Sequence, residues 1–586
     1  MRASFINRIR VLALILLGVG VVLLFRLYTI QIINGESYRA RAETQYSSQS
    51  PLHFDRGSIF FTARDGSRIS AATLETGYTV ALVPKEVTNV SVLYESLSQH
   101  LELDAEEFLE KAGKTNDPYE EIARRVPLDI GEAIKEKKLP GVQVIREKWR
   151  LYPGNETAAQ TIGFMGYGSG DTLVGQYGLE RFYDEVLTKP NTGLYVNFFA
   201  DLFAGIRSQF FSPQGQGGAD VVTSLEPNVQ TFLQGVLESY QTAWSAEEVG
   251  AIIIDPKTGS IYALATYPTF DLNHITQANP DAFSNRLVER VYEFGSIVKP
   301  LTVAAGIDAG VVTPESTYND KGYAVYDGSR ISNFDGKGRG VVSIQEVLNQ
   351  SLNTGVAHIV EKLGSNTFRS YLEAYGLKEE TGIDLPNEAE PLVSNLESPR
   401  TIEYVTASFG QGIAVTPVAM TRALAVLANH GVVPSIHVGT ALSYAGRFDK
   451  KIGWVKEERA LSPESAETVT RMLVEVVDTS LRGGSVKIPE LSVAAKTGTA
   501  QIARADARGY EENRFLHSFF GYFPAYDAQF LVFLYAVAPQ GARYASETWT
   551  APFMETVRFL VSYYDIPPDR LPVEAHRTEE SARHDL

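Results

Sequence analysis

The sequence predicts a mixed α/β (α+β) protein with two folded domains behind an N-terminal membrane-spanning helix. Three observations predict this class. An uncharged apolar run over residues 11–25 follows an N-terminus that contains three arginines. A mixed, rather polar region then continues to about residue 220. Beyond it, strand-like runs stand at both ends of the remaining chain with helical patterns between them, which indicates one sheet made from both ends of a domain.

The composition sets the limits of this interpretation. A chain of 586 residues that is 44% hydrophobic can build two or more domains, each with its own core. The net charge of -17 and the lack of a clustered basic stripe argue against nucleic acid as a partner. Because the sequence has no cysteine, thiol nucleophiles, disulfides and cysteine zinc sites are excluded.

The N-terminal apolar run is predicted to be an uncleaved membrane anchor over residues 11–33. The 15 residues of the run alone are short of the roughly 20 that a span requires. The apolar continuation to residue 33, with Arg26 reaching to the interface, brings the length into range. No A-x-A-like site follows that would mark a cleaved signal peptide. Arginines before the span place residues 1–10 in the cytoplasm and the rest of the chain outside.

Residues 34–220 are predicted to form a separate membrane-proximal domain. Its segments alternate between strand-like runs such as TGYTVALVP (76–84) and helical patterns such as EEFLEKAG (106–113). Glycine-rich turns close the region, and SPQGQGGAD (212–220) is a plausible boundary.

Residues 221–565 are predicted to form the second domain. It starts with a hairpin over 249–268, in which AIIID and SIYALAT flank the turn PKTG. Helical patterns follow at 296–310, 343–362, 366–376 and 415–430. Three strand-like runs come last, at 492–502, 517–525 and 530–537. Residues 566–586 are polar and are predicted to be a disordered tail.

The first motif that carries chemistry is EFGSIVKP, residues 293–300. We expect Ser296 to cap a helix that runs to about Ala309, with Lys299 on the same face one turn later. A helix N-terminus favours an oxyanion near Ser296. Lys299 can take the serine proton only if burial or a cationic neighbour lowers its pKa. Alone, this pair is weak, since S-x-x-K is common by chance.

Two further motifs that carry hydroxyl, amide and amine groups follow Ser296 in the sequence. Ser351-Leu352-Asn353 comes about 55 residues after Ser296, and Lys496-Thr497-Gly498-Thr499 comes about 145 residues later in a strand-like run. An ordered set of S-x-x-K, S-D-N and K-T-G motifs is typical of serine β-lactamases and penicillin-binding proteins. The sequence resembles the penicillin-binding proteins, in particular the class B, monofunctional transpeptidases with an N-terminal membrane anchor.

The resemblance extends over residues 50–565. NRLVERVYEFGSIVKP (285–300) is similar to the family's N-R-x(5)-Y-E-P-G-S-T-x-K-P, except that Phe294 and Ile297 replace its proline and threonine. Similar segments in the C-terminal half are TGIDLPNE (381–388), ASFGQGIAVTP (407–417) and HSFFGYFPA (517–525). In the N-terminal half they are DRGSIFFTARDGSRIS (55–70), RLYPGNETAAQTIGFMG (150–166) and GQYGLERFYDEVL (175–187).

The resemblance implies a fold. We expect residues 221–565 to be a serine penicillin-recognising domain, like transpeptidases and β-lactamases, with a five-stranded antiparallel sheet flanked by helices. Residues 34–220 would be the elongated α+β pedestal, of the penicillin-binding protein dimerisation type.

The resemblance also implies the role of each site residue. Ser296 would attack the penultimate D-alanine carbonyl of a stem peptide, and an amine of a neighbouring stem would resolve the acyl-enzyme. Lys299 would accept the proton of Ser296, and Ser351 would relay a proton to the leaving amine. Asn353 would hold Lys299 and the substrate amide by hydrogen bonds. The carboxylate of the substrate would be bound by Lys496, Thr497 and Thr499. Gly498 would allow close approach of substrate to the strand edge. The backbone amides of Ser296 and Thr499 would form the oxyanion hole.

The scheme needs no metal and no organic cofactor, and it predicts acylation by β-lactam antibiotics. It also leaves some polar residues out. His358 and His517 are interpreted as packed or solvated, and Arg286 and Glu293 as structural residues that order the start of the helix.

Several other functions are weighed against this one. A β-lactamase would need a base that activates water, and none can be assigned. A penicillin-sensing receptor would need several spans, and a bifunctional enzyme would need a glycan polymerase domain before residue 220. A non-catalytic scaffold is disfavoured because all three motifs are intact.

The cellular role that the resemblance favours is septal, division-type cross-linking, with elongation-type synthesis as the alternative. The segment GQYGLERFYD and the moderate length favour division. Either type is expected in the bacterial cell membrane, with a single span and an extracytoplasmic catalytic domain. The expected partner is a multispan membrane glycan polymerase, together with other proteins of the divisome or elongasome.

Overall fold

The computed structural model describes residues 55–168, 172–188, 218–444, 449–454, 458–504 and 509–570, together with Gly18. These residues form two compact units. The smaller unit contains Glu75–Trp149, and the larger contains Arg56–Leu74 and the described residues from Arg150 onward. The described residues 150–188 therefore belong to the same compact unit as the chain beyond 220, and the domain boundary near 220 stays a prediction.

The two ends of the chain lie largely outside the described residues. This applies to the predicted anchor at 11–33 and to residues 571–586 of the predicted tail. Within the described part of the chain, no helix is long and apolar enough to cross a membrane. Residues 566–570 are packed against the larger unit: Ile566 is buried and Asp569 accepts a 2.7 Å hydrogen bond from the Ser492 amide. Residues 566–570 are thus ordered, contrary to the prediction of a disordered tail from 566.

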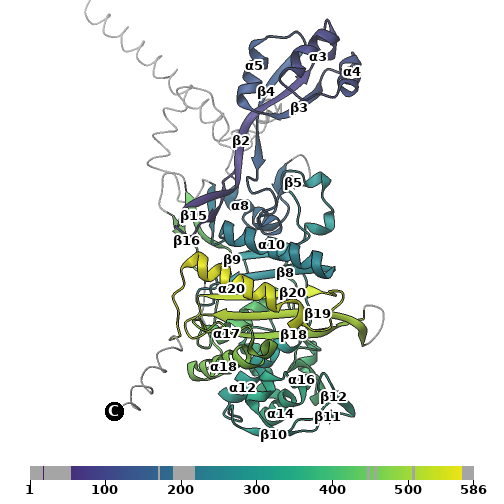
Figure 1. Cartoon of the computed structure of the whole chain (residues 1–586). Helices are drawn as coiled ribbons and strands as arrows, with labels where there is room; N and C mark the ends of the chain where they lie inside the picture. The colour runs from purple at the N-terminus through teal and green to yellow at the C-terminus, as the bar shows by residue number, and fades with distance from the viewer. Residues whose placement is uncertain are drawn as a thin grey trace, which may run out of the picture. The chain divides into compact units, whose positions relative to one another are not determined.

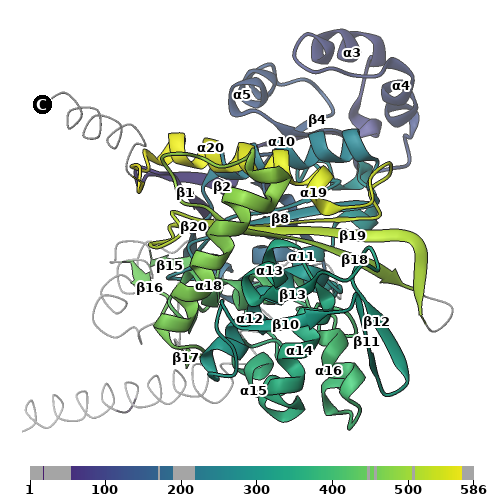
Figure 2. The ribbon, with the colours of Figure 1, turned by 60° about the horizontal axis from the view of Figure 1, so that its bottom comes forward.

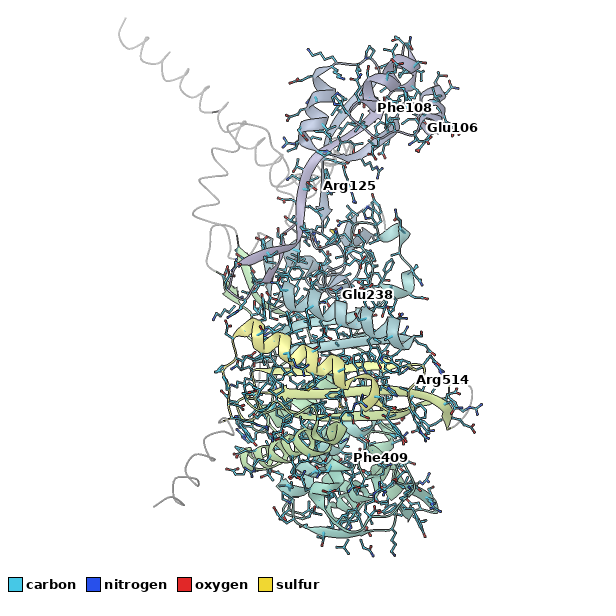
Figure 3. The ribbon with its side chains drawn as sticks, viewed as in Figure 1. Glu106, Phe108, Arg125, Glu238, Phe409 and Arg514 are labelled. Carbon is cyan, nitrogen blue, oxygen red and sulfur yellow. The ribbon has the colours of Figure 1, made fainter. Side chains whose placement is uncertain are left out.

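The smaller unit is a small sheet covered by three helices (Figure 1). Its elements are the second half of β2 (Arg68–Leu82), α3 (Val90–Ser98), α4 (Ala105–Gly113), β3 (Glu120–Val126), α5 (Leu128–Glu136) and most of β4 (Val142–Leu151). The predicted strand at 76–84 and the predicted helix at 106–113 are confirmed by β2 and α4. Phe108 is buried in the core and Glu106 on the same helix is exposed (Figure 3).

The larger unit begins with short elements before its main sheet. These are β1 (Ile59–Thr62), α6 (Ala159–Ile162), β5 (Met165–Tyr167), β6 (Leu173–Gly175), α7 (Gly178–Phe182), α8 (Asp184–Leu187) and β7 (Ala219–Thr223). β1 pairs with the start of β2 and, in parallel, with β7. β7 then pairs with β15 (Gly439–Tyr444), which pairs with β16 (Lys450–Lys451).

A buried network of ion pairs connects the three N-terminal sequence motifs at residues 55–70, 150–166 and 175–187. Glu180, from the segment at 175–187, is fully buried and binds two arginines. Its Oε2 lies 2.7 Å from Nε of Arg56 and its Oε1 lies 2.6 Å from Nε of Arg150. Arg56 also binds Asp184 at 2.8 Å. Buried charges are tolerated when they are paired in this way, so the three motifs hold one another inside the larger unit.

The main sheet has the predicted five antiparallel strands. Its order is β18-β19-β20-β8-β9, so strands from the two ends of the domain are neighbours, as expected. The strands are β8 (Glu248–Ile254), β9 (Ile261–Tyr267), β18 (Ala494–Ala503), β19 (Tyr510–Phe523) and β20 (Phe530–Val537). β19 begins seven residues before the predicted run, because residues 510–516, of which 511–514 are polar, extend the ladder and pair with the end of β18.

Both faces of the sheet are buried, which explains its continuously apolar strands. Alternate side chains enter two different cores. Ile253 and Phe519 face the core beneath α10 (Pro227–Trp244) and α20 (Thr550–Tyr564). Ile252 and Phe520 face the opposite core, which is shared with the helices between β9 and β18. The result is a three-layer unit with α10 and α20 on one side of the sheet (Figure 1).

The helical layer on the opposite face of the sheet from α10 and α20 holds most of the remaining elements. Its helices are α11 (Arg286–Glu289), α12 (Lys299–Asp308), α13 (Ile344–Asn349), α14 (Asn353–Leu363), α15 (Ser365–Ala374), α16 (Thr401–Ala407), α17 (Pro417–Ala428) and α18 (Pro463–Glu475), and α19 (Ala545–Thr548) follows the last strand. Its strand pairs are β10 (Thr317–Asp320) with β13 (Gly340–Ser343), β11 (Tyr323–Tyr326) with β12 (Ser329–Ser332), and β14 (Val432–Val433) with β17 (Glu458–Arg459). The β11–β12 hairpin and the projecting end of β18 and β19 lie on the same side of the unit (Figure 2).

The helical predictions at 366–376 and 415–430 are confirmed by α15 and α17. The pattern at 343–362 is not one helix: it is divided into α13 and α14 by a turn at Ser351. Ser351 has a φ of 55°, a left-handed conformation that interrupts a helix.

Candidate active site

The segment that carries Ser296 is a tight turn followed by a helix. Ser296 lies inside a 3₁₀ helix, Gly295–Val298, and α12 begins only at Lys299, with Pro300 in its first turn. The prediction that Ser296 caps the α-helix is therefore wrong. The 3₁₀ geometry brings residues three apart into line, so Ser296 and Lys299 still share one face. Gly295 is required here: it has a φ of 66°, and a Cβ on it would lie 2.7 Å from the carbonyl oxygen of Thr499.

Phe294 and Ile297, the two departures from the family pattern, anchor this turn in the core. Both side chains are buried. The Phe294 ring meets the edge of Phe533 at a centroid distance of 5.2 Å, on the central strand β20. The Phe294 carbonyl accepts a 2.8 Å hydrogen bond from the Ser518 hydroxyl. The turn at Ser296 is thus fixed to the sheet by both the ring and the carbonyl of Phe294.

Lys299 is buried beneath this turn with its amine held by Ser351. Its Nζ lies 2.5 Å from the Ser351 carbonyl oxygen and 3.1 Å from Ser351 Oγ. Burial, and then the nearby charge of Lys496, lower the pKa of Lys299 well below its usual value. These are the two conditions under which a lysine acts as a proton acceptor near neutral pH.

The turn between α13 and α14 presents Ser351 and Asn353 to the same place. The left-handed backbone of Ser351 lets both its carbonyl and its hydroxyl contact Lys299. Asn353 lies at the start of α14 and its Nδ2 donates to the Ser332 carbonyl at 2.9 Å. This contact connects α14 to the β11–β12 hairpin. The resemblance implied a hydrogen bond between Asn353 and Lys299. Both residues are described in the structure, and it shows no hydrogen bond between them.

The strand β18 contributes Lys496 and the residues after it. Nζ of Lys496 lies 3.1 Å from Ser351 Oγ and 3.1 Å from the Thr497 carbonyl oxygen. Burial lowers the pKa of Lys496 to about 8. The Thr499 hydroxyl accepts a 3.1 Å hydrogen bond from the Ala545 amide at the start of α19.

Gly498 has a packing role that the sequence did not suggest. A Cβ on it would lie 2.3 Å from Ser518 Oγ and 2.6 Å from the Phe294 carbonyl oxygen. A side chain at this position would therefore collide with the nucleophile turn. The predicted close approach of substrate at Gly498 stays a prediction.

One cavity of about 830 Å³ brings the three motifs together. Its lining includes Ser296, Ser351, Asn353, Lys496, Thr497 and Thr499. The walls are rich in cationic side chains that sequence reasoning missed, namely Arg330, Arg339, Arg482 and Arg543, against a single acidic one, Glu512. No motif marks these arginines, because they come from four separate segments that only the fold brings together. A cavity of this charge suits an anionic ligand, although the whole chain has a net charge of -17.

The polar residues that were set aside have structural contacts. His358 stacks on Tyr318, and the buried His517 contacts the Thr548 hydroxyl and the Arg543 carbonyl. Burial lowers the pKa of His517 to about 4, so this ring is neutral. Arg286 forms an ion pair with the buried Glu248 at 3.2 Å. Among the described residues, no group of three or more histidine, aspartate or glutamate side chains is arranged to hold a metal ion.

Comparisons with known proteins agree with this architecture. Residues 249–557 match the penicillin-binding protein transpeptidase domain, and residues 55–193 match the penicillin-binding protein dimerisation domain. Stage V sporulation protein D of Bacillus subtilis is 27% identical over 569 residues, which cover 95% of this chain and 86% of that protein. The peptidoglycan D,D-transpeptidase FtsI of Escherichia coli K12 is 27% identical over 456 residues, 77% of this chain and 73% of the relative.

A solved structure shows the same fold. Penicillin-binding protein 3 from Mycobacterium tuberculosis, complexed with aztreonam, superposes with a TM-score of 0.67 at 21% sequence identity. The superposition covers 88% of this chain and 98% of that one. A transpeptidase domain that spans more than half of the sequence, behind a dimerisation domain, establishes the family. The chain belongs to the class B penicillin-binding proteins, the transpeptidases with a penicillin-binding protein dimerisation domain.

Proposed function

We propose that this chain is a serine-type peptidoglycan D,D-transpeptidase that works through an acyl-enzyme on Ser296. One observation carries the proposal: two buried lysines, Lys299 and Lys496, contact the same Ser351 hydroxyl in the cavity that Ser296 lines. Acyl transfer needs a nucleophile, a base and a group that relays a proton. Ser296, Lys299 with its lowered pKa, and the Ser351 hydroxyl between the two amines can serve as these three. The relatives whose names state an activity support the same chemistry.

Acylation uses these groups in turn. The neutral amine of Lys299 takes the proton of the Ser296 hydroxyl, and Oγ attacks the carbonyl carbon of the penultimate D-alanine. The bond from that carbon to the nitrogen of the terminal D-alanine breaks. The proton passes from Lys299 through the Ser351 hydroxyl to the departing nitrogen, so free D-alanine leaves as a neutral amine and Lys299 is neutral again.

The second half-reaction reverses these steps with a different amine. An amine of a neighbouring stem attacks the acyl carbon and loses a proton to Lys299. Ser296 Oγ then leaves and regains the proton from Lys299, which becomes neutral again, and a new amide joins the two stems. A β-lactam enters the same scheme as an acyl donor, since its ring carbonyl is open to attack by Ser296.

The backbone amides of Ser296 and Thr499 are proposed as the oxyanion hole. The close approach of the Thr499 carbonyl oxygen to Gly295 supports this assignment. In an antiparallel strand, the N–H and C=O of one residue point to the same edge. The Thr499 N–H is thus on the edge that faces the nucleophile turn.

The charged walls of the cavity support a substrate that ends in a carboxylate. Lys496 is proposed to bind this carboxylate together with the hydroxyls of Thr497 and Thr499, and Asn353 to contact the substrate amide. Arg330, Arg482 and Arg543 add positive charge around them. Electrostatic complementarity of this kind raises the rate at which an anionic ligand binds.

The sequence supports a proposal for the location and the partners. We propose a single-pass protein of the bacterial cell membrane, with residues 11–33 as anchor and the catalytic unit outside. A multispan glycan polymerase is the proposed partner, bound through the anchor and the pedestal. Replacing the anchor with an unrelated span should abolish co-purification of the polymerase, and unchanged recovery would refute this contact.

Septal synthesis is the cellular role that we propose, supported by the segment GQYGLERFYD. Sequence identity does not choose between roles, because the sporulation protein and FtsI are both 27% identical to this chain. Depletion of the protein in its host separates the roles. Filaments without septa are expected, whereas rounded cells would assign it to elongation.

A labelled penicillin tests the enzyme class directly. The full-length protein should form a stable covalent adduct, and a Ser296→Ala variant should form none. Release of D-alanine and formation of a cross-linked dimer from stem pentapeptides should depend on Ser296 as well. Rapid turnover of the penicillin would indicate a β-lactamase, and the absence of an adduct would indicate a scaffold.

A further inference from the structure

We propose that Asp320, a residue outside the three motifs, is a positioning residue for the turn at Ser351. It acts through Asn333 and Thr354, to which it is hydrogen-bonded in the interior. We call these three residues the Asp320 network. The inference rests on the proposed function, because the Ser351 hydroxyl is the proposed proton relay to the leaving nitrogen.

Asp320 is a buried carboxylate at the end of β10, only 2% exposed. Its Oδ1 accepts hydrogen bonds from the Gly322 amide and the Thr354 hydroxyl, both at 2.8 Å. Its Oδ2 accepts from Asn333 Nδ2 at 2.9 Å and from the Arg339 amide at 3.1 Å. A buried carboxylate is tolerated only when it is hydrogen-bonded in this way. The carboxylate therefore holds four parts of the chain around one point.

The network supplies the cap that helix α14 lacks. The N-cap residue, Leu352, has no side chain that accepts from the first turn. The amide of Thr354 donates instead to Asn333 Oδ1 at 3.2 Å. The first amides of a helix have no partner within it, so an acceptor from another segment stabilises the start of the helix. The negative charge of Asp320 beside this turn also favours the positive end of the helix dipole.

Asp320 determines which way the Asn333 amide points. A carboxylate can only accept, so it holds the donor end of the amide toward itself. Asn333 Nδ2 donates to both carboxylate oxygens, at 3.1 and 2.9 Å, and Oδ1 is left for the start of α14. The Thr354 hydroxyl binds the same carboxylate. Asp320 therefore holds the start of the helix both directly and through Asn333.

A neighbouring contact attaches the same helical turn to the β11–β12 hairpin. Asn353 Nδ2 donates to the Ser332 carbonyl at 2.9 Å, next to the contact between Thr354 and Asn333. Two consecutive residues of α14 are thus bound to two consecutive residues at the end of β12, which lies beside this helix (Figure 2).

A further connection reaches the turn from its other end. The Arg339 amide binds Asp320, and the Arg339 side chain donates from Nε to Gln350 Oε1 at 3.1 Å. Gln350 directly precedes Ser351. Ser351 has a φ of 55°, a conformation that persists only where the surrounding structure fixes it. Asp320 is connected to the chain on both sides of this strained residue.

Loss of the network should displace the relay more than the nucleophile. Ser351 Oγ lies 3.1 Å from Nζ of both Lys299 and Lys496, so a shift of the turn breaks these contacts. Ser296 and Lys299 lie on a different segment, the 3₁₀ helix and the start of α12. We therefore expect slower departure of a nitrogen that needs a proton, and a smaller effect on the attack by Ser296.

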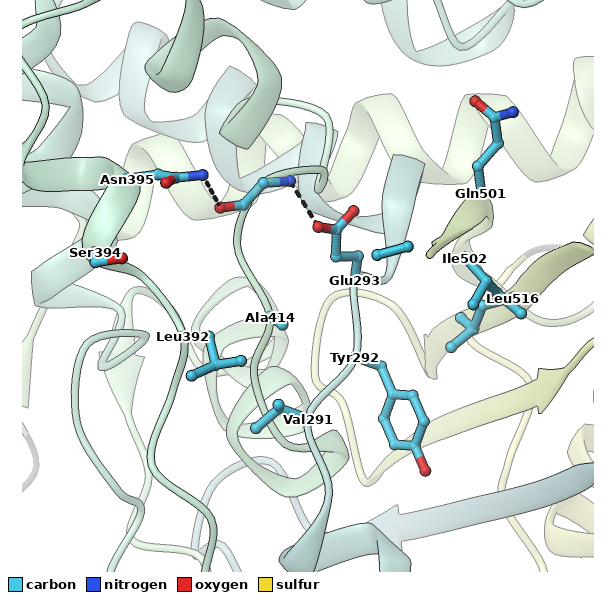
Figure 4. A pocket seen from close by; sticks show the side chains of 12 residues that line it. Val291, Tyr292, Glu293, Leu392, Ser394, Asn395, Ala414, Gln501, Ile502 and Leu516 are labelled. Atoms are coloured by element: carbon cyan, nitrogen blue, oxygen red, sulfur yellow. Dashed lines mark hydrogen bonds between the residues drawn. The ribbon is translucent and has the colours of Figure 1, made fainter. Parts of the chain in front are cut away.

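Glu293, a carboxylate just before the catalytic serine, holds a different part of the cleft and serves as the comparison. It lines a second cavity of about 440 Å³ (Figure 4). Its Oε1 accepts from the Gly412 amide at 3.1 Å, and the Tyr510 hydroxyl also binds it. Asn395 Nδ2 donates to the Gly412 carbonyl at 2.8 Å. These contacts fix the segment around Gly412 and not the turn at Ser351.

Two acyl donors that differ in one position test the inference. The first is a stem pentapeptide that ends in D-alanyl-D-alanine, and in the second a sulfur replaces the nitrogen of the terminal residue. Both keep the terminal carboxylate. The nitrogen needs a proton to leave, whereas a thiolate leaves without one, because a free thiol has a pKa of about 8.5. The ratio of kcat/KM for the amide to kcat/KM for the thioester therefore reports on the relay.

Thr354→Val removes the hydroxyl that binds Asp320 and keeps the shape of the side chain. We expect the amide-to-thioester ratio to fall about tenfold or more, because small displacements of a catalytic group cost up to about 100-fold in rate. Thr354→Ser restores the hydroxyl and should restore the ratio. Thr317→Val, the same change at an exposed residue of β10, should leave both rates unchanged.

Two further variants separate positioning from stability. Asp320→Asn turns one acceptor into a donor that opposes its neighbours, and it should lower the ratio as Thr354→Val does. Glu293→Gln should slow both donors alike if it slows either. A role in folding alone would lower stability in urea and leave every ratio unchanged. An unchanged ratio in folded Thr354→Val overturns the inference, as does an equal fall of the ratio in Glu293→Gln.

Labelled penicillin keeps this test separate from the proposed function. Adduct formation on Ser296 and release of D-alanine by the unmodified protein establish the function without any use of the variants. Unchanged ratios in such an active protein refute the role of Asp320 alone. A protein that forms no adduct and releases no D-alanine refutes the function and the inference together.

Discussion

Lys299 and Lys496 share one acceptor, since the Nζ atom of each lies 3.1 Å from the hydroxyl oxygen of Ser351. Two ammonium groups at one oxygen repel each other, and both lysines are buried. Burial and the charge of Lys496 lower the pKa of Lys299 well below its usual value, whereas burial alone lowers that of Lys496 to about 8. The arrangement therefore supports the proposed division of roles, in which Lys299 is the neutral base and Lys496 keeps the positive charge.

Lys299→Arg should abolish rapid acylation although it preserves the charge. A guanidinium stays protonated and cannot take the Ser296 proton. We expect the rate of adduct formation with labelled penicillin to fall by about 100-fold or more, the range found for loss of a general base. Lys257→Arg, at an exposed lysine paired with Asp527, is the matched control and should react at the normal rate. A normal rate in Lys299→Arg would exclude Lys299 as the base.

The pH profile of acylation should reveal the coupling between the two lysines. Because only neutral Lys299 accepts a proton, the acylation rate is low in acid and rises as pH increases through the folded-state pKa of Lys299. Lys496→Met removes one of the two causes that lower this pKa, so the pKa rises. The ascending limb of the profile should then move to higher pH, measured by stopped-flow acylation across the range. A limb that stays in place, or moves to lower pH, would show that Lys496 does not act on Lys299.

Recognition of the substrate carboxylate should weaken above about pH 8, where Lys496 loses its proton. A stem peptide with a free C-terminal carboxylate should show a rising KM above this pH. The same peptide with a C-terminal amide should bind less well at neutral pH and show no such rise. If both peptides lose affinity in parallel, the titration belongs to another group.

The sequence predicts which residues gather in the cavity and where the strands of the main sheet lie, but not how distant segments pack against them. Ser296, Lys299, Ser351 and Lys496 meet at one place in the structure, and the sequence predicts this grouping because the three motifs are short and keep their order. The strands of the main sheet were predicted because residues buried on both faces form continuous apolar runs. These two kinds of pattern are local, so one sequence suffices to read them.

The features that were missed depend on contacts between distant segments. The role of Phe294 arises from Phe533, more than 200 residues away in the chain. The division of the helix at 343–362 arises because Ser351 takes a left-handed conformation to contact Lys299. The arginines of the cavity come from separate segments of the chain and carry no motif. Each of these requires the fold before it can be seen.

Gly498→Ala should reduce acylation although glycine and alanine differ by one methyl group. The added Cβ would lie 2.6 Å from the Phe294 carbonyl oxygen, a backbone atom that cannot move without displacing the nucleophile turn. We expect at least a tenfold fall in the penicillin acylation rate, about 1.4 kcal/mol in activation free energy. Gly235→Ala, in helix α10 with open space around its Cβ position, is the control and should not slow acylation. A normal acylation rate in Gly498→Ala would show that the turn at Ser296 can move to accept the methyl group without an effect on acylation.

Phe294→Ala should destabilise the catalytic unit and loosen the nucleophile turn together. The ring is almost fully buried and packs edge-on against Phe533 and Tyr535 of β20. Removal of such a ring costs about 3–5 kcal/mol in the free energy of unfolding, because it leaves a cavity as well as lost contacts. Urea denaturation followed by near-ultraviolet circular dichroism measures this loss. Phe182→Ala, at a ring that is 46% exposed, should cost less than about 1 kcal/mol. Equal losses of unfolding free energy in the two variants would contradict the anchoring role of Phe294. A loosened turn should also present Ser296 less well to its substrate. A folded Phe294→Ala variant that is acylated as fast as the unmodified protein would therefore contradict the role as well.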